Sequence, residues 1–110
     1  MSEDKLQSQC FQWAWNAHPQ TRRLLWAVPN GGWRHVIEAM KLKATGVVKG
    51  VHDMHFFWDK VLYTFELKVD KNRLSKEQKE WGELVRTHGA FTYEIRDFET
   101  FKDVFTKIIL

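Results

Sequence analysis

The sequence contains a single cysteine, Cys10, so no disulfide bond can form within the chain. A lone cysteine without a disulfide partner is typical of a reducing compartment. Cys10 lies in an apolar pattern with helical spacing. We therefore expect a small buried side chain at this position rather than a nucleophile.

Long apolar runs are also missing, and the first ten residues are polar and carry no signal-peptide pattern. We therefore expect a soluble, cytoplasmic protein without a membrane partner. Proline and glycine are few, with two and six residues respectively. Their scarcity argues against a disordered or low-complexity chain.

The residues that are present suffice for one folded core. Hydrophobic residues make up 44% and aromatic residues 15% of the 110 residues, so we expect a single domain over residues 1–110. The formal net charge is +3, and residues 22–60 concentrate positive charge, with seven basic and three acidic side chains. This segment fits a polyanionic partner without requiring one.

Apolar periodicity predicts an alternation of helices and strands. The predicted order is α-β-α-β-β-α-β-α, in which a hairpin combines with crossover connections. This order indicates an α/β fold with a mixed central sheet flanked by helices. The predicted elements are helices over 3–17 and 33–45, between Ser75 and Gly89, and after Asp97, with strands over 24–28 and 91–96 and a hairpin within 50–71.

Three elements carry specific expectations about burial. The strand over 24–28 is short and wholly apolar, which predicts a buried strand. The second helix is expected to end at Gly46. The side chains expected to face the core are Val36, Ile37, Met40 and Ala44 in the second helix and Trp81, Leu84 and Val85 in the third.

The hairpin within 50–71 has a predictable register. Two runs that alternate in strand fashion meet at Asp59-Lys60. A loop of two residues there pairs Trp58 with Val61, and a loop of four residues keeps the same register. Every other pair in the hairpin follows from this one.

The same register places two acids face to face. Asp53 lies directly opposite Glu66, on the face away from the apolar side chains, and Lys68 points the same way. Opposed side chains in a sheet have Cβ atoms about 4.5–5.5 Å apart, and opposed like charges destabilise the sheet. A bound divalent cation would account for this pairing.

Asp53 and Glu66 offer the oxygen ligands that Mg²⁺ or Mn²⁺ prefers, together with water and substrate phosphate. The backbone carbonyl of Leu67 lies between the site-facing side chains and is the expected third protein oxygen. Metal-bound water is a nucleophile for phosphodiesters, and Lys68 would orient that water or stabilise transition-state charge. The alternative is an ordinary solvated hairpin face on which Glu66 and Lys68 are surface charges.

Two histidines near Asp53 suggest a rival zinc or HD-type phosphohydrolase site. On a strand, His52 would point away from Asp53 while His55 would share its face, so the three side chains would not converge. We expect His55 to be a polar neighbour that faces Thr64.

A turn and a basic helix offer contacts to a phosphate backbone. Backbone N–H groups at a strand-to-helix turn can hold a phosphate, although a plain turn has the same sequence pattern. Sequence-independent contacts to the DNA backbone would come from lysine and arginine, each of which is equally well explained as a solvated charge. The candidate DNA-binding residues are Asn30, Gly31, Gly32, Arg34, Lys41, Lys43 and Lys49.

Four segments together resemble the virus-type replication-repair nuclease (VRR-NUC) domain, a branch of the PD-(D/E)XK nucleases with a restriction-endonuclease-like fold. Each segment alone is unspecific, but all four occur in the order and spacing of the family and span nearly the whole chain. The segments are 28–32 (VPNGG), 43–53 (KATGVVKGVHD), 65–68 (FELK) and 73–81 (RLSKEQKEW).

The resemblance implies a Mg²⁺- or Mn²⁺-dependent endonuclease that acts on branched DNA in DNA repair. Stand-alone phage members look like homodimeric resolvases of four-way (Holliday) junctions, so the chain is expected to be phage-encoded in a bacterial host and to act as a homodimer. Two alternatives stay open within this class: a weak or inactive junction-binding module, and a flap or nicking nuclease without junction preference. A non-catalytic interaction domain is the third.

The resemblance assigns roles to five residues. Asp53, Glu66 and Lys68 match the two acids and the lysine of the family motif. Gln78 matches a glutamine that supports the metal and water, although Ser75 and Gln78 also have capping-box spacing. Glu3 matches an additional first-helix ligand, and an acid that merely favours a helix N-terminus explains it equally well.

The sequence departs from the family pattern at one position. His52 stands where the family usually has proline before the aspartate. Proline there shapes the backbone and does no chemistry, so the departure concerns the placement of Asp53.

Overall fold

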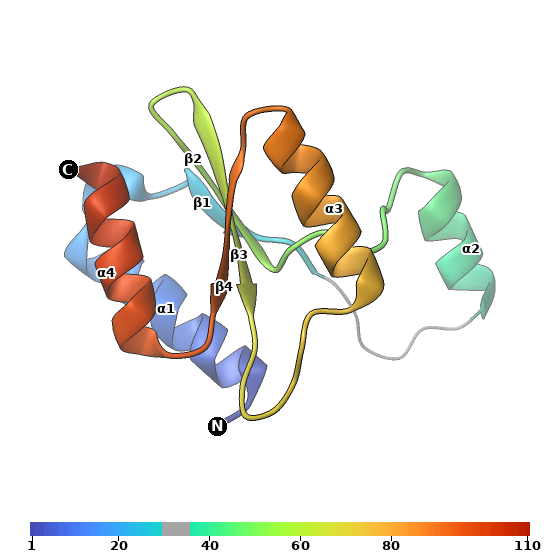
Figure 1. Ribbon diagram of the computed structural model, residues 1–110, viewed down its shortest axis with the longest axis horizontal. Coiled ribbons are helices and arrows are strands. Elements are labelled where there is room, and N and C mark those ends of the chain that lie inside the picture. The colour runs from blue at the N-terminus through green and yellow to red at the C-terminus, as the bar shows by residue number, and fades with distance from the viewer. Residues whose placement is uncertain (30–35) are drawn as a thin grey trace.

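The computed structural model describes residues 1–29 and 36–110. Its elements are the helices α1 (Glu3–Ala17), η1 (Pro19–Thr21), α2 (Val36–Ala44), α3 (Lys76–Thr87) and α4 (Phe98–Ile109), and the strands β1 (Leu25–Ala27), β2 (Met54–Trp58), β3 (Val61–Leu67) and β4 (Phe91–Ile95). This order is the predicted one, with the short 3₁₀ helix η1 added. Helices α1 and α4 cover one face of the sheet, and α3 covers the other (Figure 1). None of the helices described is long and apolar enough to cross a membrane.

The sheet is mixed, as predicted. Its strand order is β1-β2-β3-β4. The pairs β1–β2 and β2–β3 are antiparallel, whereas β4 runs parallel to β3. Parallel neighbours need a crossover connection, and α3 supplies it.

The hairpin has the predicted register and the shorter of the two predicted loops. Trp58 pairs with Val61 and Met54 with Phe65. Asp59 and Lys60 both have positive φ angles, 50° and 69°. Two consecutive residues in this conformation are typical of a type I′ turn, whose twist matches that of the strands.

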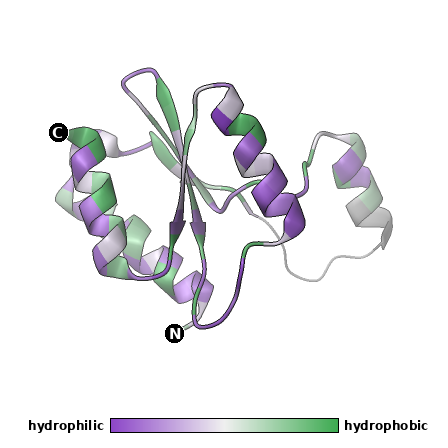
Figure 2. Ribbon diagram, in the orientation of Figure 1, coloured by the Kyte–Doolittle hydropathy of each residue, from purple (hydrophilic) through white to green (hydrophobic). Residues whose placement is uncertain are grey.

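Aromatic rings dominate the core between the sheet and α4. Phe56 and Phe65 on the sheet, and Phe101 and Phe105 on α4, are completely buried. The ring centroids of Phe56 and Phe105 are 4.6 Å apart, and those of Phe65 and Phe101 are 5.1 Å apart. Both α1 and α4 carry hydrophobic and hydrophilic residues in alternation around their axes (Figure 2). The α1 residues in this core are Leu6, Cys10 and Ala14.

Cys10 is a buried core residue, as expected. Burial raises the pKa of its thiol to about 12. Because the thiolate is the reactive form, this cysteine is chemically inert in the folded protein.

Strand β1 is not buried as predicted. Leu25 is buried, but Trp26 and Ala27 are exposed. The strand lies at an edge of the sheet, where it has a neighbour on one side only. A short apolar run does not distinguish such an edge strand from a central one.

The expected inward face of α2 is wrong at Met40 and Ala44. Both side chains are exposed, and α2 stands to the side of the sheet (Figure 1). Periodicity shows which residues share a helix face but not whether another element packs against that face. Residues 33–35 and the side chains of Val36 and Ile37 lie outside the described part. Gly46 follows the helix with φ +106°, as expected for its C-terminal cap.

Helix α3 begins and ends as predicted, but the face that it buries is rotated slightly about the helix axis from the predicted face. Trp81 and Val85 are half-buried, whereas Leu84 is 58% exposed, which contradicts the expected inward position. The covered stripe consists of Gln78, Trp81, Gly82 and Val85 at helical spacing. This stripe includes a glutamine and a glycine, Gln78 and Gly82, which also line the candidate site.

Candidate functional site

Asp53 is held across the hairpin by two backbone groups. The N–H of Leu67 donates to Asp53 Oδ2 at 2.8 Å. The N–H of Val28 donates to the backbone carbonyl of Asp53 at 2.8 Å. Asp53 lies just before β2. Extending the hairpin register by one pair beyond Met54 and Phe65 places it opposite Glu66, its predicted partner. The aspartate is therefore oriented by a backbone group at the end of β3 and by one directly after β1.

Glu66 is a buried carboxylate that uses only one of its oxygens. Its side chain is 2% exposed. Oε2 accepts a hydrogen bond from Gln78 Nε2 at 3.1 Å and lies 3.4 Å from Lys68 Nζ. Oε1 is buried and has no hydrogen-bond partner. A buried oxygen without a partner is costly, and either a bound cation or a proton shared with Asp53 would satisfy it.

Burial and the nearby charge of Asp53 raise the pKa of Glu66 to about 8. Lys68 opposes this shift from a position where it is 9% exposed itself. The pair of acids therefore carries less than its full negative charge at neutral pH. A cation between the carboxylates would reverse the shift, because opposite charge favours the ionised form.

The donor set fits a hard divalent cation. Among the described residues, no three His, Cys, Asp or Glu side chains gather at metal-binding spacing. Two carboxylates, one with a free buried oxygen, are the protein ligands that Mg²⁺ takes while keeping water and phosphate oxygens in its shell. Asp53 and Glu66 would hold such an ion. The carbonyl of Leu67 as a third ligand stays a prediction.

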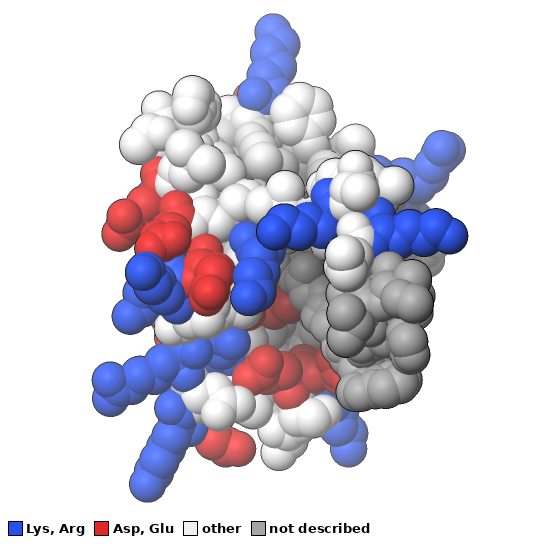
Figure 3. All heavy atoms as spheres, turned by 90° about the vertical axis from the view of Figure 1, so that its right-hand side faces the viewer, with Lys and Arg blue, Asp and Glu red and all other residues white. Residues whose placement is uncertain are grey.

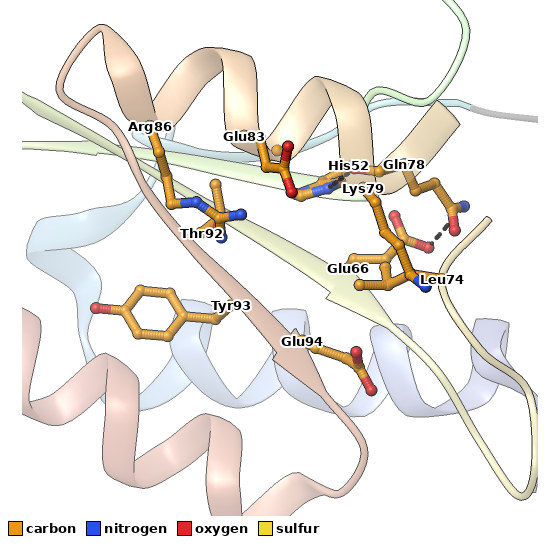
Figure 4. Close-up of a pocket in the computed structure, with 11 residues that line it drawn as sticks. His52, Glu66, Leu74, Gln78, Lys79, Glu83, Arg86, Thr92, Tyr93 and Glu94 are labelled. Carbon is orange, nitrogen blue, oxygen red and sulfur yellow. Dashed lines mark hydrogen bonds between the residues drawn. The ribbon is translucent and has the colours of Figure 1, made fainter. Parts of the chain in front are cut away.

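Gln78 forms the predicted capping box and also contacts Glu66, and its support of a metal and water stays a prediction. Its backbone N–H and side-chain Oε1 form the two halves of a capping box with Ser75. Its side-chain Nε2 donates at the same time to Glu66. Figure 4 shows this contact, with Gln78 reaching from the start of α3 towards Glu66. The cap thus orients the amide that holds the carboxylate.

The expected orientation of His52 is wrong. Its ring packs edge-on against Trp81 of α3, with centroids 4.8 Å apart, on the same side as His55. We expected His52 to point away because strand side chains alternate. However, residues 51–53 precede β2 and are not in strand conformation, so the alternation does not apply.

His55 pairs with Thr64, as predicted. Its ring stacks on Trp81 with centroids 5.4 Å apart and contacts Trp26 on its other side. Burial lowers its pKa, so the ring is neutral at physiological pH. His55 is a packed polar neighbour of the site.

Glu3 contacts Asn72, whose side-chain amide donates to Glu3 Oε2 at 2.9 Å. Asn72 lies in the connection between β3 and α3. The contact brings α1 to this connection, and a role of Glu3 as a metal ligand stays a prediction.

The candidate DNA-binding residues fall into two groups. Asn30, Gly31, Gly32 and Arg34 lie outside the described residues. Lys41, Lys43 and Lys49 are exposed on and after α2. Lys and Arg side chains project from this side of the molecule among the acidic ones (Figure 3).

A pocket that no sequence pattern predicted adjoins Glu66. It has a volume of about 240 Å³ and lies between α3 and β4 (Figure 4). Its charged wall includes Lys79 and Arg86, and Arg86 donates to Thr92 across the opening. In the sequence these residues look like ordinary exposed helix charges. The glycine within α3, Gly82, was the one available signal that something packs closely there.

Comparisons with known proteins agree with the geometry. The family model described as the VRR-NUC domain matches residues 1–96. A solved structure titled "VRR_NUC domain protein" superposes with a TM-score of 0.75 at 18% sequence identity, covering 96% of this chain and 86% of that one. At this identity the likeness shows a shared fold. A comparison with curated proteins gives no match.

Proposed function

Because the chain belongs to the VRR-NUC domain family, we propose that it is a Mg²⁺- or Mn²⁺-dependent endonuclease that hydrolyses phosphodiester bonds in branched DNA. The observation that carries the proposal is the free, buried Oε1 of Glu66 beside Asp53. A nuclease-type domain follows from the family. The metal and the DNA structure are the proposed part.

The metal would activate water and neutralise charge on the phosphate. Asp53 and Glu66 would hold the ion, and the Leu67 N–H fixes the orientation of the Asp53 carboxylate. Lys68, buried with its amine 3.4 Å from Glu66 Oε2, would stabilise negative charge that develops on a phosphate bound beside the acids. Gln78 prevents the Glu66 carboxylate from rotating away.

The preference for four-way junctions is inferred from the resemblance to stand-alone phage members of the family, and the homodimer is inferred from the number of sites. One chain with one site cuts one strand, so symmetrical cleavage of a junction requires two copies. The exposed Lys41, Lys43 and Lys49 are suited to sequence-independent contacts with the DNA backbone. Asn30, Gly31, Gly32 and Arg34 also belong to the proposed DNA-contacting set.

The decisive experiment is cleavage of a substrate panel, comprising linear duplex, flap, splayed arm and four-way junction, with Mg²⁺ and with Mn²⁺. We expect metal-dependent cleavage of the junction that is lost in Asp53→Ala, Glu66→Ala and Lys68→Ala. The matched control is Asp103→Ala, which removes an exposed acid of α4 and should leave cleavage unchanged.

Other outcomes separate the remaining readings. Junction binding without cleavage in either metal would show a binding module. Equal cleavage of flaps and junctions would show a nuclease without junction preference. If the protein binds no DNA at low salt, it is an interaction domain, and the nuclease proposal is wrong.

A further inference from the structure

We propose that His52 is a positioning residue that fixes the first turn of α3 over the hairpin and thereby sets Gln78 against Glu66. The link to catalysis rests on the proposed nuclease function. The positioning of Gln78 by His52 is inferred only from contacts within the protein without metal.

Both ring nitrogens of His52 have partners. Nε2 lies 3.0 Å from the backbone carbonyl of Gln78, and Nδ1 lies 2.8 Å from Thr64 Oγ1. A carbonyl only accepts, so Nε2 must carry the proton. In a neutral ring Nδ1 then accepts from the Thr64 hydroxyl. The contacts therefore specify one tautomer.

These two hydrogen bonds, together with the one from Gln78 to Glu66, connect β3, His52 and α3 in a closed series of contacts. Thr64 precedes Glu66 by two residues on β3, so both side chains emerge on the same face. The His52 ring bridges from Thr64 to the Gln78 backbone, and the Gln78 side chain returns to Glu66. Sliding or tilting α3 against the sheet would break at least one of the three contacts. His52 thus holds the backbone of the residue whose side chain holds the carboxylate.

Helix α3 has a glycine, Gly82, at the position where the His52 ring packs against it. A Cβ atom built on Gly82 would lie 3.0 Å from His52 Cε1. Gly82 is buried in the interior of α3, where glycine is an unfavourable helix residue. A side chain at this position would push the ring away or lift the helix.

A second glycine, Gly50, lets the segment that leads into the hairpin lie close to the first turn of α3. Gly50 has φ +87°, and a Cβ atom there would lie 2.3 Å from the backbone oxygen of Glu77. Glycine is the residue that adopts this φ without strain. The segment that leads into His52 is therefore packed directly on the first turn of α3.

A histidine that only filled space would need neither polar contact, and this difference can be tested. His52→Leu fills the space of the ring with an apolar side chain but loses both hydrogen bonds. His52→Gln keeps a donor and an acceptor that are able to replace the two ring nitrogens. Thr64→Val removes one hydroxyl without changing the shape of the side chain. Its matched control is Thr106→Val, which makes the same change on α4, away from α3.

The first measurement is NMR of the metal-free protein. We expect His52 as the Nε2–H tautomer, and slow hydrogen exchange of the Gln78 side-chain amide. His52→Leu and Thr64→Val should speed this exchange, whereas His52→Gln and Thr106→Val should preserve it. An Nδ1–H tautomer, or unchanged exchange in folded His52→Leu and Thr64→Val, would overturn the proposal.

The second measurement is Mn²⁺ affinity by calorimetry, in a cycle with Gln78→Ala. Residues that orient metal ligands typically change affinity about 10–100-fold, so we expect His52→Leu to weaken binding at least roughly tenfold. The same substitution should have little further effect once Gln78 is alanine, and His52→Gln should restore most of the affinity. Full additivity of the two losses would contradict action through Gln78. If wild type binds no Mn²⁺, the proposed function fails, and the NMR result still decides the role of His52.

Discussion

Glu66 experiences opposite influences from its neighbours. Its burial and the adjacent Asp53 favour the neutral acid, whereas Lys68 favours the carboxylate. The outcome is a pKa of about 8 in the metal-free protein, against an ordinary value of 4.5. A residue poised in this way is unfavourable for stability at neutral pH but is ready to bind a cation.

The first prediction concerns pH in the presence of EDTA. Between the ordinary pKa of 4.5 and the folded value of about 8, the unfolded chain releases the Glu66 proton while the folded chain keeps it. Stability is therefore highest below this window and falls as pH rises through it, by up to about 1.4 kcal/mol per pH unit. Glu66→Gln should remove this contribution.

The measured quantity is the difference in melting temperature between wild type and Glu66→Gln from pH 5 to pH 8. A difference is needed because His52 and His55 have pKa values lowered by burial and contribute a slope of opposite sign near their own titration. A difference that stays constant with pH would show that the Glu66 pKa is not raised.

The second prediction concerns Asp53→Asn. The change removes a negative charge from beside Glu66, while the asparagine oxygen can still accept from the Leu67 N–H. In EDTA we expect stabilisation of up to about 1 kcal/mol, or about 4–8 °C in a small domain. Mn²⁺ should stabilise wild type but not the variant. A lower melting temperature in EDTA would mean that the Asp53 charge is structural.

At the scale of elements, α3 is a helix whose N-terminal cap also belongs to the site. Ser75 caps the helix, and the capping-box glutamine is the one that holds Glu66. The N-terminal cap therefore does more than stabilise the start of the helix. It restricts the Gln78 amide to one orientation.

The third prediction compares two helix caps. Ser75→Ala and Asp97→Ala each remove a side chain that accepts from a backbone N–H, at the starts of α3 and α4. Each loss should destabilise the protein by about 1 kcal/mol. Only Ser75→Ala should also weaken Mn²⁺ binding, because only that cap orients Gln78. Calorimetric titration of both variants checks this, and equal Mn²⁺ affinities would show that the cap and the site are independent.

At the scale of the whole molecule, the core and the site occupy opposite faces of one sheet. The aromatic core lies under α1 and α4, whereas α3 covers the face with Glu66 and Lys68 (Figure 1). Helix α2 extends to the side with exposed Lys41 and Lys43. Positive charge is thus displayed away from the structural core.

The fourth prediction concerns the salt dependence of DNA binding without cleavage. Each phosphate contact that is lost should reduce the slope of log K against log salt by about 0.9. We expect the double change Lys41→Ala and Lys43→Ala to flatten this slope for a four-way junction, measured by fluorescence anisotropy in EDTA. Lys107→Ala, which removes an exposed lysine of α4, is the control. Identical slopes in all three proteins would exclude α2 from the DNA interface.

The amino-acid sequence by itself determined the order of elements, the hairpin register and the caps, because these depend on periodicity and on neighbours in the chain. The hairpin register predicted Glu66 opposite Asp53 with Lys68 on the same face, whereas the proximity of Gln78 rested on the family resemblance. Helix ends at Ser75 and Asp97 follow from side chains that accept from the next turn. The sequence pattern was sufficient wherever the relevant contact was local.

Only the tertiary structure decided what covers each face. Exposure of Trp26, Met40 and Leu84 depends on whether another element packs there, which no periodicity records. The orientation of His52 likewise depends on α3, 26 residues away along the chain at Gln78. The residue that sequence alone marked as a departure from its family is therefore, in the fold, a link between the hairpin and the helix of the site, because its ring is clamped by partners that only folding brings together.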